Sequence, residues 1–334
     1  MMKKFNDIPL SILDLAPIVQ GSNATDSFKE SVELAQNAEK WGYNRYWLAE
    51  HHNMPGIASS ATSVLIGHIA EKTNHMRIGS GGVMLPNHAT IVIAEQFGTL
   101  ESLYPGRIDL GLGRAPGTDQ QTAYALRRTL HMGPEDFPMQ VNELQDYFSD
   151  NPVSRVRAVP GQGLDIPIWL LGSSDFSARL AAEKGLRFSF ASHFAPAYLH
   201  AALRLYRDNF KPTEKLEKPY AMIGVNVIAA DTDEKANYIA SSHQQQFLNI
   251  RKGIQTKLQA PVKNMDEIWS PMEKAAVEQS LDPNTTIVGS PATVRQKLER
   301  LQQSTKADEI IISSQIFHLE DRLRSYEIVS ELMN

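Results

Sequence analysis

The sequence predicts an α/β fold, a (β/α)8 TIM barrel that residues 1–334 form as a single domain. Strand-like apolar runs alternate with helix-like amphipathic runs about eight times along the chain, which is the rhythm of this fold. No low-complexity linker divides the 334 residues, a length that barrels of this kind commonly reach. A doubly wound parallel sheet, built from the same units, is the alternative architecture.

The first half of the chain alternates strands with helices without a break. The strands are predicted at residues 8–15, 45–49, 76–85 and 107–112. The first helix is predicted to open at a capping box formed by Ser27 and Glu30 and to end at Gly42. The later helices of this half are predicted at residues 61–72, 90–103 and around 141–148.

The second half keeps the alternation but contains one long excursion. Its strands are predicted at residues 166–171, 187–191, 220–229 and 308–313. Its helices are predicted at residues 176–184, 197–210, 234–247, 292–301 and 319–332. Residues 248–283, between the seventh and eighth strands, are polar, are interrupted by Pro261, Pro271 and Pro283, and are too long for an ordinary connection. We expect them to form an active-site lid or insertion.

The composition excludes several classes of function. Lys and Arg total 33 against 38 Asp and Glu, and no basic run could hold a nucleic-acid backbone or an anionic membrane, so we expect neither as a partner. The chain has no cysteine, which excludes disulfides, thiolate metal sites and a thiol nucleophile. No apolar stretch is long enough for a signal peptide or a membrane span, so we expect a cytoplasmic protein.

Two adjacent histidines, His51 and His52, follow the second predicted strand together with Glu50. Imidazole changes charge near neutral pH, and catalytic groups of barrel enzymes lie at the carboxyl ends of the strands. The competing interpretation is that these histidines only cap the strand and form local hydrogen bonds. A metal-dependent hydrolase that uses both is disfavoured, because adjacent strand residues point to opposite faces.

Glycine-rich runs mark the next two strand ends. The run Gly-Ser-Gly-Gly at 79–82 is typical of a backbone that lies against a flat ligand, and a bend that closes the barrel is the alternative. The run at 111–117 matches a dinucleotide fingerprint at first sight, but its spacing and its place after the fourth strand argue against one. Arg114 within this run offers planar donors to a phosphate or a carboxylate, or forms a salt bridge at the rim.

Hydroxyl side chains gather after the fifth strand, in the segment Gly-Ser-Ser-Asp-Phe-Ser at 172–177. The first N–H groups of a helix lack partners and its dipole favours negative charge, so this segment predicts an anion site. An ordinary helix cap explains any single serine, whereas three serines opposite Arg114 favour a phosphate. After the sixth strand, His193 and Phe194 are candidates for a substrate pocket or for packing.

In combination these motifs resemble one family, the bacterial luciferase-like flavin-dependent monooxygenases, nearly from end to end. The segments that carry the resemblance, in order and spacing, are residues 47–52, 78–86, 113–114 and 180–186. Two more segments, 11–17 and 191–196, are similar to luciferase-like proteins of enteric bacteria.

The resemblance implies a homodimeric barrel that binds FMN at the carboxyl ends of its strands. The residues that it places at the cofactor are Glu50, Gly81, Gly82, Arg114, Gly172, Ser173, Ser174 and Ser177. The arginine and the three serines would hold the phosphate, and a non-proline cis peptide between the two adjacent glycines would lie beneath the isoalloxazine. No metal is implied.

The resemblance also implies a reaction. Reduced FMN, supplied by a separate NAD(P)H:flavin reductase, would react with O2 to a C4a-hydroperoxide that oxidises a small or medium organic substrate. His51 would be the catalytic acid or base, and His193 and Phe194 would line the substrate pocket. Two positions depart from the luciferases: Gly113 replaces a reactive cysteine, which disfavours light emission, and Ser173 replaces a glutamate.

Two other functions fit the same motifs. One is a hydride-transfer oxidoreductase that uses a deazaflavin, and the other is a flavin-binding protein without turnover. The sequence leaves the organic substrate open, because the side chains that line the pocket come from separate loops.

Overall fold

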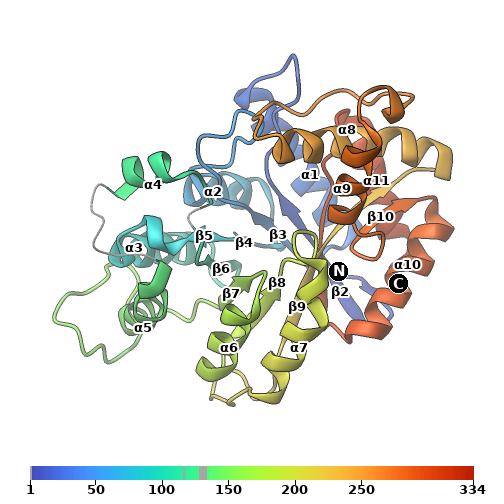
Figure 1. The fold of residues 1–334 in the computed structure, drawn as a ribbon. Helices are drawn as coiled ribbons and strands as arrows, with labels where there is room; N and C mark the ends of the chain where they lie inside the picture. Colours follow the sequence, from blue (N-terminus) through green and yellow to red (C-terminus); the bar gives the residue numbers. More distant parts are fainter. Residues whose placement is uncertain (1, 116, 128–133) are drawn as a thin grey trace.

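The computed structural model describes residues 2–115, 117–127 and 134–334, and within them eight parallel strands close into a barrel (Figure 1). Around the barrel the strands are β2 (Ile8–Asp14), β3 (Arg45–Leu48), β4 (Arg77–Ser80), β6 (Ile108–Gly113), β7 (Ile168–Gly172), β8 (Arg187–Phe190), β9 (Ala221–Ala229) and β11 (Glu309–Ser313). The sheet closes because β2 pairs in parallel with β3 on one side and with β11 on the other. The predicted (β/α)8 barrel is confirmed, and the open doubly wound sheet is wrong.

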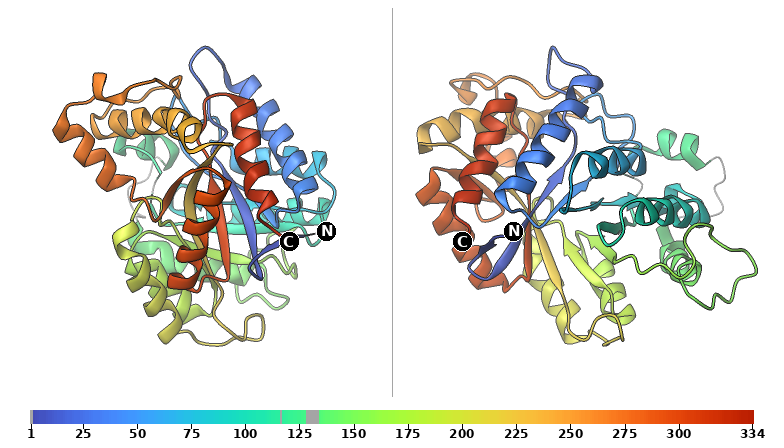
Figure 2. Two further views of the ribbon diagram at one scale, coloured as in Figure 1. Left: turned by 90° about the vertical axis from the view of Figure 1, so that its right-hand side faces the viewer. Right: turned by 180° about the vertical axis from the view of Figure 1, so that it is seen from behind.

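Helices surround the barrel on its outside (Figures 1 and 2). Along the chain they are α1 (Ala24–Trp41), α2 (Thr62–Lys72), α3 (Thr90–Leu103), α4 (Gln120–Arg127), α5 (Phe137–Tyr147), α6 (Asp175–Lys184), α7 (Leu199–Asp208), α8 (Asp233–Arg251), α9 (Pro271–Ser280), α10 (Pro291–Thr305) and α11 (Leu319–Glu331). Short 3-10 turns in the connections are η1 (Leu85–Asn87), η2 (Pro134–Asp136), η3 (Pro196–Tyr198) and η4 (Met265–Glu267). Among the described residues, no helix combines the length and the apolar character that crossing a membrane requires.

The start of α1 differs from the prediction. The helix begins at Ala24, and the side-chain oxygen of Asn23 accepts a hydrogen bond from the N–H of Asp26 at 3.2 Å. The predicted capping box at Ser27 is therefore wrong, because Asn23 already occupies the cap position and Ser27 is buried inside the helix. The predicted end is confirmed, since Gly42 adopts a left-handed φ of 91° that favours glycine.

The third predicted strand, 76–85, is interrupted in its middle. After β4 the peptide between Gly81 and Gly82 is cis, as the resemblance implied, and a short strand β5 (Val83–Met84) follows beside β6. A Cβ at Gly82 would lie 2.8 Å from the carbonyl oxygen of Gly111. The two backbones therefore approach more closely than a residue with a side chain permits.

Two other short strands extend the sheet beyond the barrel. Strand β1 (Lys4–Phe5) runs antiparallel to β2, and β10 (Thr286–Gly289) runs parallel to β9. The backbones of Lys4 and Asn334 exchange two hydrogen bonds of 3.0 and 2.8 Å. The two ends of the chain therefore lie side by side, as Figure 2 shows.

Side chains of β3 alternate between the inside and the outside of the barrel. Tyr46 and Leu48 belong to the large core between the strands and the helices, whereas Trp47 and Ala49 belong to a smaller core inside the barrel. In that inner core the rings of Trp47 and Trp169 meet edge to face with their centroids 5.2 Å apart. The period of two continues past the strand end and directs His51 towards the barrel axis.

Buried charges fill the amino-terminal end of the barrel. The guanidinium of Arg45 lies 2.6 Å from Asp109 and 2.7 Å from Glu309, and all three side chains are buried. Removing one partner of such a group typically costs about 3–5 kcal/mol, because a buried charge is left uncompensated. Each of these charges therefore depends on the others for compensation.

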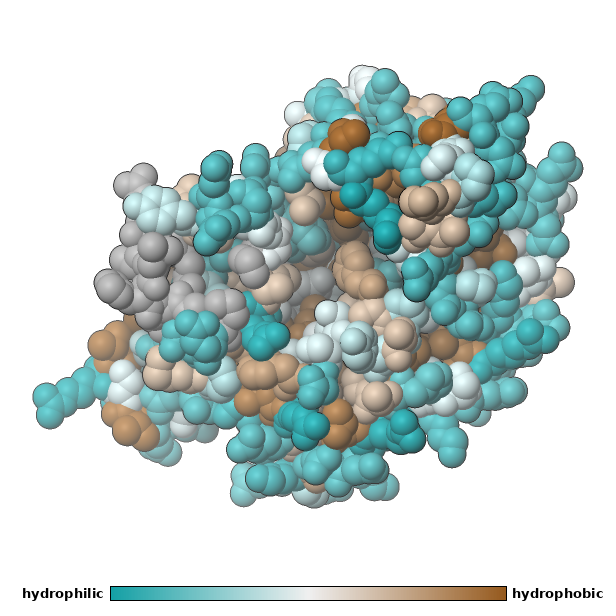
Figure 3. All heavy atoms as spheres, viewed as in Figure 1, coloured by the Kyte–Doolittle hydropathy of each residue, from teal (hydrophilic) through white to brown (hydrophobic). Residues whose placement is uncertain are grey.

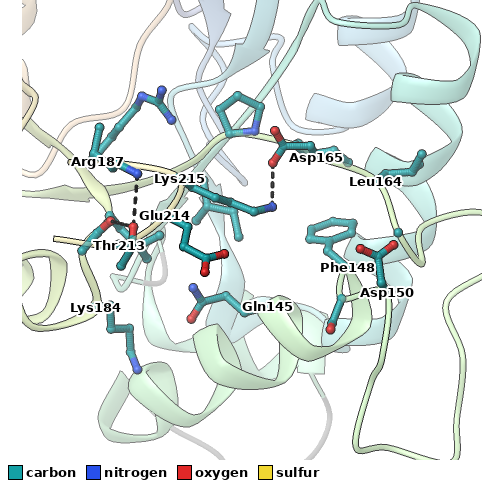
Figure 4. A pocket seen from close by; sticks show the side chains of 18 residues that line it. Gln145, Phe148, Asp150, Leu164, Asp165, Lys184, Arg187, Thr213, Glu214 and Lys215 are labelled. Atoms are coloured by element: carbon teal, nitrogen blue, oxygen red, sulfur yellow. Dashed lines mark hydrogen bonds and ion pairs between the residues drawn. The ribbon is translucent and has the colours of Figure 1, made fainter.

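A large hollow of about 990 Å³ lies outside the barrel at this same end, where α5 and the end of α6 meet the starts of β7 and β8 (Figure 4). Lys215 pairs there with Asp165 at 2.6 Å, but both side chains are more than two-thirds exposed. An exposed pair of this kind contributes less than about 1 kcal/mol. Barrel enzymes carry their chemistry at the opposite end, so this hollow is not the candidate site.

The predicted excursion, 248–283, lies on the carboxyl side of the strands. Leu258 forms a parallel bridge with Val19 in the loop after β2. A Cβ at Gly56, in the loop after β3, would lie 2.5 Å from the carbonyl oxygen of Thr256. The excursion therefore packs on the rim of the barrel mouth, and its role as a lid stays a prediction.

Candidate active site

A cavity of about 260 Å³ opens at the carboxyl ends of the barrel strands. Figure 3 shows a hollow in this face of the molecule, below α8 and α9. The predicted site residues that line the cavity are Glu50, His51, Gly81, Arg114, Gly172, Ser173, Ser174, Ser177, His193 and Phe194. Gly82, also predicted, lies just outside the lining with its backbone against Gly111.

The inner wall of the cavity is apolar, which sequence reasoning missed. The side chains that form it include Leu13, Trp47, Leu171 and Ile311. They come from four different strands, so only the inward half of the strand period could have indicated them. An apolar wall of this kind suits the apolar face of a ring and excludes water.

His51 follows β3 and is partly buried. Its backbone N–H donates to the carbonyl oxygen of Ser59 at 3.0 Å, and its ring nitrogen Nδ1 lies 3.4 Å from the carbonyl oxygen of Gly117. Burial lowers the pKa of His51, against the smaller opposite effect of the Gly117 carbonyl. The imidazole is therefore neutral at pH 7 and able to accept a proton.

Glu50 is buried and already has several partners. One carboxylate oxygen accepts hydrogen bonds from Nε2 of His52 at 2.8 Å and Nε2 of His88 at 2.9 Å, and the other accepts from the N–H of Met84 at 3.0 Å. Burial would raise the pKa of Glu50, but the bonds from His52 and His88 outweigh it and hold the pKa at about 2. Sequence reasoning missed His88, since nothing in its local pattern distinguishes it from other loop histidines.

Arg114 follows β6 and presents an unpaired cation. Its guanidinium carbon lies over the ring of Phe176, 4.0 Å from the centroid, in a cation–π contact. Among the described residues, no carboxylate lies within ion-pair distance of it. The predicted alternative of a salt bridge at the rim is therefore absent from this part of the chain, and the guanidinium is available to an anion.

The start of α6 faces the same cavity. Ser174 is the N-cap residue, yet its side chain forms no capping hydrogen bond. Ser177 is buried in the first turn, and a Cβ at Gly172 would lie 2.5 Å from its Cβ, so glycine keeps the cradle open. Free N–H groups, two serine hydroxyls and the helix dipole together form a site that fits a phosphate.

His193 and Phe194 form the wall after β8. Their ring centroids lie 4.3 Å apart, His193 is buried, and Phe194 is largely exposed at the rim. Nδ1 of His193 has no hydrogen-bond partner among the described residues, and neither ring nitrogen of His243 on α8 has one. Burial lowers the pKa of both histidines to about 4. Both rings are therefore neutral, and sequence reasoning missed His243 because it lies in a helix.

The two adjacent histidines serve different contacts. His51 lines the cavity, whereas Nε2 of His52 binds Glu50. Within the part of the chain that the structure describes, no group of three or more His, Asp or Glu side chains is arranged to hold a metal ion.

The fold and the cavity define a class: a TIM barrel whose candidate site combines an anion cradle with a neutral imidazole. A family model described as luciferase-like monooxygenase matches residues 9–308, and the chain belongs to this family. It is 59% identical over 328 residues to the uncharacterized protein YvbT of Bacillus subtilis, covering 98% of this chain and 97% of that one. It is 55% identical over 326 residues to the luciferase-like monooxygenase of Escherichia coli K12, covering 97% of each.

Solved structures agree with this membership. The crystal structure of apo-MsnO8 matches with a TM-score of 0.87 at 32% identity, covering 97% of this chain and 98% of that one. The oxygenating constituent of 3,6-diketocamphane monooxygenase from Pseudomonas putida, solved in complex with FMN, has a TM-score of 0.74 at 17% identity, covers 97% of each chain and shows likeness of fold alone. The N-acetyl-S-alkylcysteine monooxygenase of Bacillus subtilis is 33% identical over 337 residues, covering 97% of this chain and 98% of that one.

Proposed function

We propose that this protein is a cytoplasmic FMN-dependent monooxygenase that uses reduced FMN and O2 on a small or medium organic substrate. The observation that carries the proposal is the guanidinium of Arg114, which has no ion-pair partner among the described residues. It lies over the ring of Phe176 at the start of α6 and in the same cavity as His51. A cation, free helix N–H groups and hydroxyls fit a phosphate, and the apolar wall beside them fits a flat ring.

The division of roles follows from these contacts. Arg114, Ser173, Ser174 and Ser177 would bind the phosphate, and the backbone at Gly81 would support the ring. Reduced FMN, when bound, supplies the electrons that activate O2. The residues of this chain bind and orient the ring, exclude water with the apolar wall, and exchange a proton at the neutral imidazole of His51.

The substrate remains to be assigned, and one relative indicates where to begin. Because a protein 33% identical over 337 residues is named N-acetyl-S-alkylcysteine monooxygenase, thioethers are the first class to test here. The apolar wall of the cavity suits an alkyl or aryl group of such a molecule.

Anaerobic titrations test the cofactor. Oxidised and reduced FMN, riboflavin and a reduced deazaflavin are added to the purified protein, and binding is followed by absorbance and fluorescence. We expect reduced FMN to bind at least about tenfold more tightly than riboflavin, because riboflavin lacks the phosphate. Equal affinities for reduced FMN and riboflavin would contradict the phosphate site, and a preference for the deazaflavin would favour the hydride-transfer alternative.

Isotope labelling tests the reaction. The protein is mixed with photoreduced FMN and 18O2 in the presence of N-acetyl-S-methylcysteine and related thioethers. Incorporation of one labelled oxygen into an organic product would support a monooxygenase. Flavin oxidation at the buffer rate, with every substrate offered, would favour a flavin-binding protein without turnover.

The electron supply and the assembly stay predictions of the same proposal. With NADH or NADPH alone we expect no oxygen consumption, and with a separate NAD(P)H:flavin reductase and FMN we expect it to begin. Light scattering of the purified chain tests the predicted homodimer.

A further inference from the structure

Two loops at the barrel mouth, residues 51–53 after β3 and residues 117–119 after β6, are joined residue by residue. The contacts are His51 Nδ1 to Gly117 O (3.4 Å), Thr118 Oγ1 to His52 O (3.1 Å) and Asn53 Nδ2 to Asp119 Oδ2 (3.1 Å). We call these three contacts the loop clamp. The clamp holds one backbone carbonyl against the ring that lines the cavity.

The contact at Gly117 favours one position for the ring proton of His51. A carbonyl oxygen only accepts hydrogen bonds, so a hydrogen bond between Nδ1 and this oxygen requires the proton on Nδ1. A neutral imidazole has one N–H, which leaves Nε2 with a free lone pair. The bond from the backbone N–H of His51 to Ser59 fixes the main chain and does not touch the ring.

We propose that the loop clamp selects the tautomer of His51, and that Thr118 and Asp119 are positioning residues that keep Nε2 free to accept a proton. The proposal rests on the proposed function only in taking His51 as the group that exchanges protons there. Neither Thr118 nor Asp119 lines the cavity, so each acts through the position of the Gly117 carbonyl.

The loop clamp requires glycine at position 117. Its φ is +64°, in the left-handed region, and a Cβ there would lie 3.1 Å from the carbonyl oxygen of Glu50 and 3.1 Å from Cγ of Met84. A side chain at this position would therefore push the loop away from His51, and only glycine lets the carbonyl approach the ring.

Asp119 ties the loop clamp to α4. Besides the bond from Asn53, its carboxylate accepts hydrogen bonds from the N–H of Thr122 at 2.9 Å and from its hydroxyl at 2.7 Å, in the first turn of α4. A shift of α4 would therefore move the loop clamp and, with it, the carbonyl that contacts His51. The helix follows β6, whereas His51 follows β3.

Nitrogen-15 NMR of histidine-labelled full-length protein, without flavin, tests the inference directly. The long-range couplings of each ring distinguish the two tautomers, and His51→Ala identifies the signals of His51. We expect Nδ1 to be protonated and Nε2 to be unprotonated in the unchanged protein. In Thr118→Val we expect the tautomer ratio to shift by about fivefold towards Nε2–H, the effect of losing roughly one ordinary hydrogen bond.

Matched variants separate positioning from general destabilisation. Thr118→Ser keeps the hydroxyl and should restore the original ratio. Thr62→Val removes a similar bond, from the Thr62 hydroxyl to the carbonyl oxygen of Ala49 at 3.0 Å, and should cost similar stability without changing the tautomer. Asp119→Ala should shift the ratio in the same direction as Thr118→Val.

The kinetic readout links the tautomer to turnover. For a substrate identified by isotope labelling, kcat of Thr118→Val should fall in proportion to the fraction of Nδ1-protonated ring, while FMN affinity stays unchanged. An Nε2–H tautomer in the unchanged protein, or an unaltered ratio in both Thr118→Val and Asp119→Ala, would overturn the inference. Failure of the proposed function appears differently, as absent oxygen chemistry in a protein whose NMR result is as expected.

Discussion

Nε2 of His52 lies 2.8 Å from Oε1 of Glu50, and Nε2 of His88, which follows β5 and η1, lies 2.9 Å from the same oxygen. The carboxylate thereby joins the loops after β3 and β5 immediately behind His51. This relationship places a buried negative charge beside the cavity without leaving it unpaired.

Replacing Glu50 by Gln should lower the free energy of unfolding at pH 7 by about 1–3 kcal/mol, because charge-assisted hydrogen bonds are lost. The pKa of Glu50 is about 2 in the folded protein, below its ordinary value of 4.5, so its stabilisation is complete above pH 4.5 and fades as the pH falls towards 2. Urea denaturation at pH 7 measures the loss, and urea denaturation between pH 5 and 2 measures how the difference fades.

Glu39→Gln is the matched control for that change. Burial raises the pKa of Glu39, but backbone N–H groups of residues 74–76 hold it at about 2, and the residue lies far from the cavity lining. Glu39→Gln should lose a similar free energy of unfolding at pH 7. If Glu50→Gln is as stable as the unchanged protein at pH 7, the carboxylate is not charged there.

Replacing Arg114 by Ala should weaken FMN binding by about 10- to 100-fold, the effect of losing charge-assisted bonds to a phosphate. Riboflavin affinity should change little. Arg179→Ala is the control, since Arg179 lies on α6, the helix that carries Phe176, but is exposed and pairs with Asp175 at 3.2 Å. Calorimetry with both ligands checks this, and an equal loss for riboflavin would mean that Arg114 contacts the ring instead.

Replacing His51 by Ala should lower turnover by about 10²–10⁴-fold, the usual contribution of a general acid or base, with FMN affinity within about twofold. Because burial lowers the pKa of His51, the neutral ring persists below pH 6.5 and the acidic limb of the activity profile should lie there. The exposed His75→Gln serves as control. Unchanged turnover in His51→Ala would assign the proton transfer to another group.

The buried pair His193 and His243 predicts sensitivity to acid. Both have a pKa of about 4 in the folded protein against 6.5 in the unfolded chain, so the unfolded state binds more protons below pH 6.5. Stability should therefore decrease by a few kcal/mol, on the order of 1.4 per pKa unit and group, as the pH falls from 6.5 to 4. Urea denaturation of His243→Phe should show a shallower dependence, whereas the exposed His200→Gln should follow the unchanged protein.

The alternation of strands and helices predicted where the site lies, because a closed parallel barrel places the carboxyl ends of all its strands on one side. His51, Arg114 and Ser174 follow three different strands, 50 or more residues apart, and a closed parallel barrel brings all strand ends to one mouth. Identifying the strands was therefore enough to predict that these residues converge. The roles of these residues at a cofactor stay predictions.

Contacts between loops could not be predicted in the same way. The bond from His88 to Glu50 and the approach of Gly117 to His51 depend on loop paths that no period encodes. The contact of Phe176 with Arg114 was also missed, because the sequence analysis interpreted the start of α6 through its serines alone. At α1 the N-cap is Asn23, which caps a helix as well as a serine does, and the sequence pattern did not reveal that Ser27 is buried inside the helix.

The edge-to-face pair of Trp47 and Trp169 has an optical consequence. Two of the four tryptophans stand in the barrel interior, and Trp47 lines the cavity. Indole emission overlaps the near-ultraviolet and blue absorption of oxidised flavins, so a ring seated on that wall would quench it by energy transfer. The intrinsic tryptophan fluorescence would therefore report flavin binding. Substituting Trp41 and Trp269 with Phe would leave a signal that arises from the barrel interior alone.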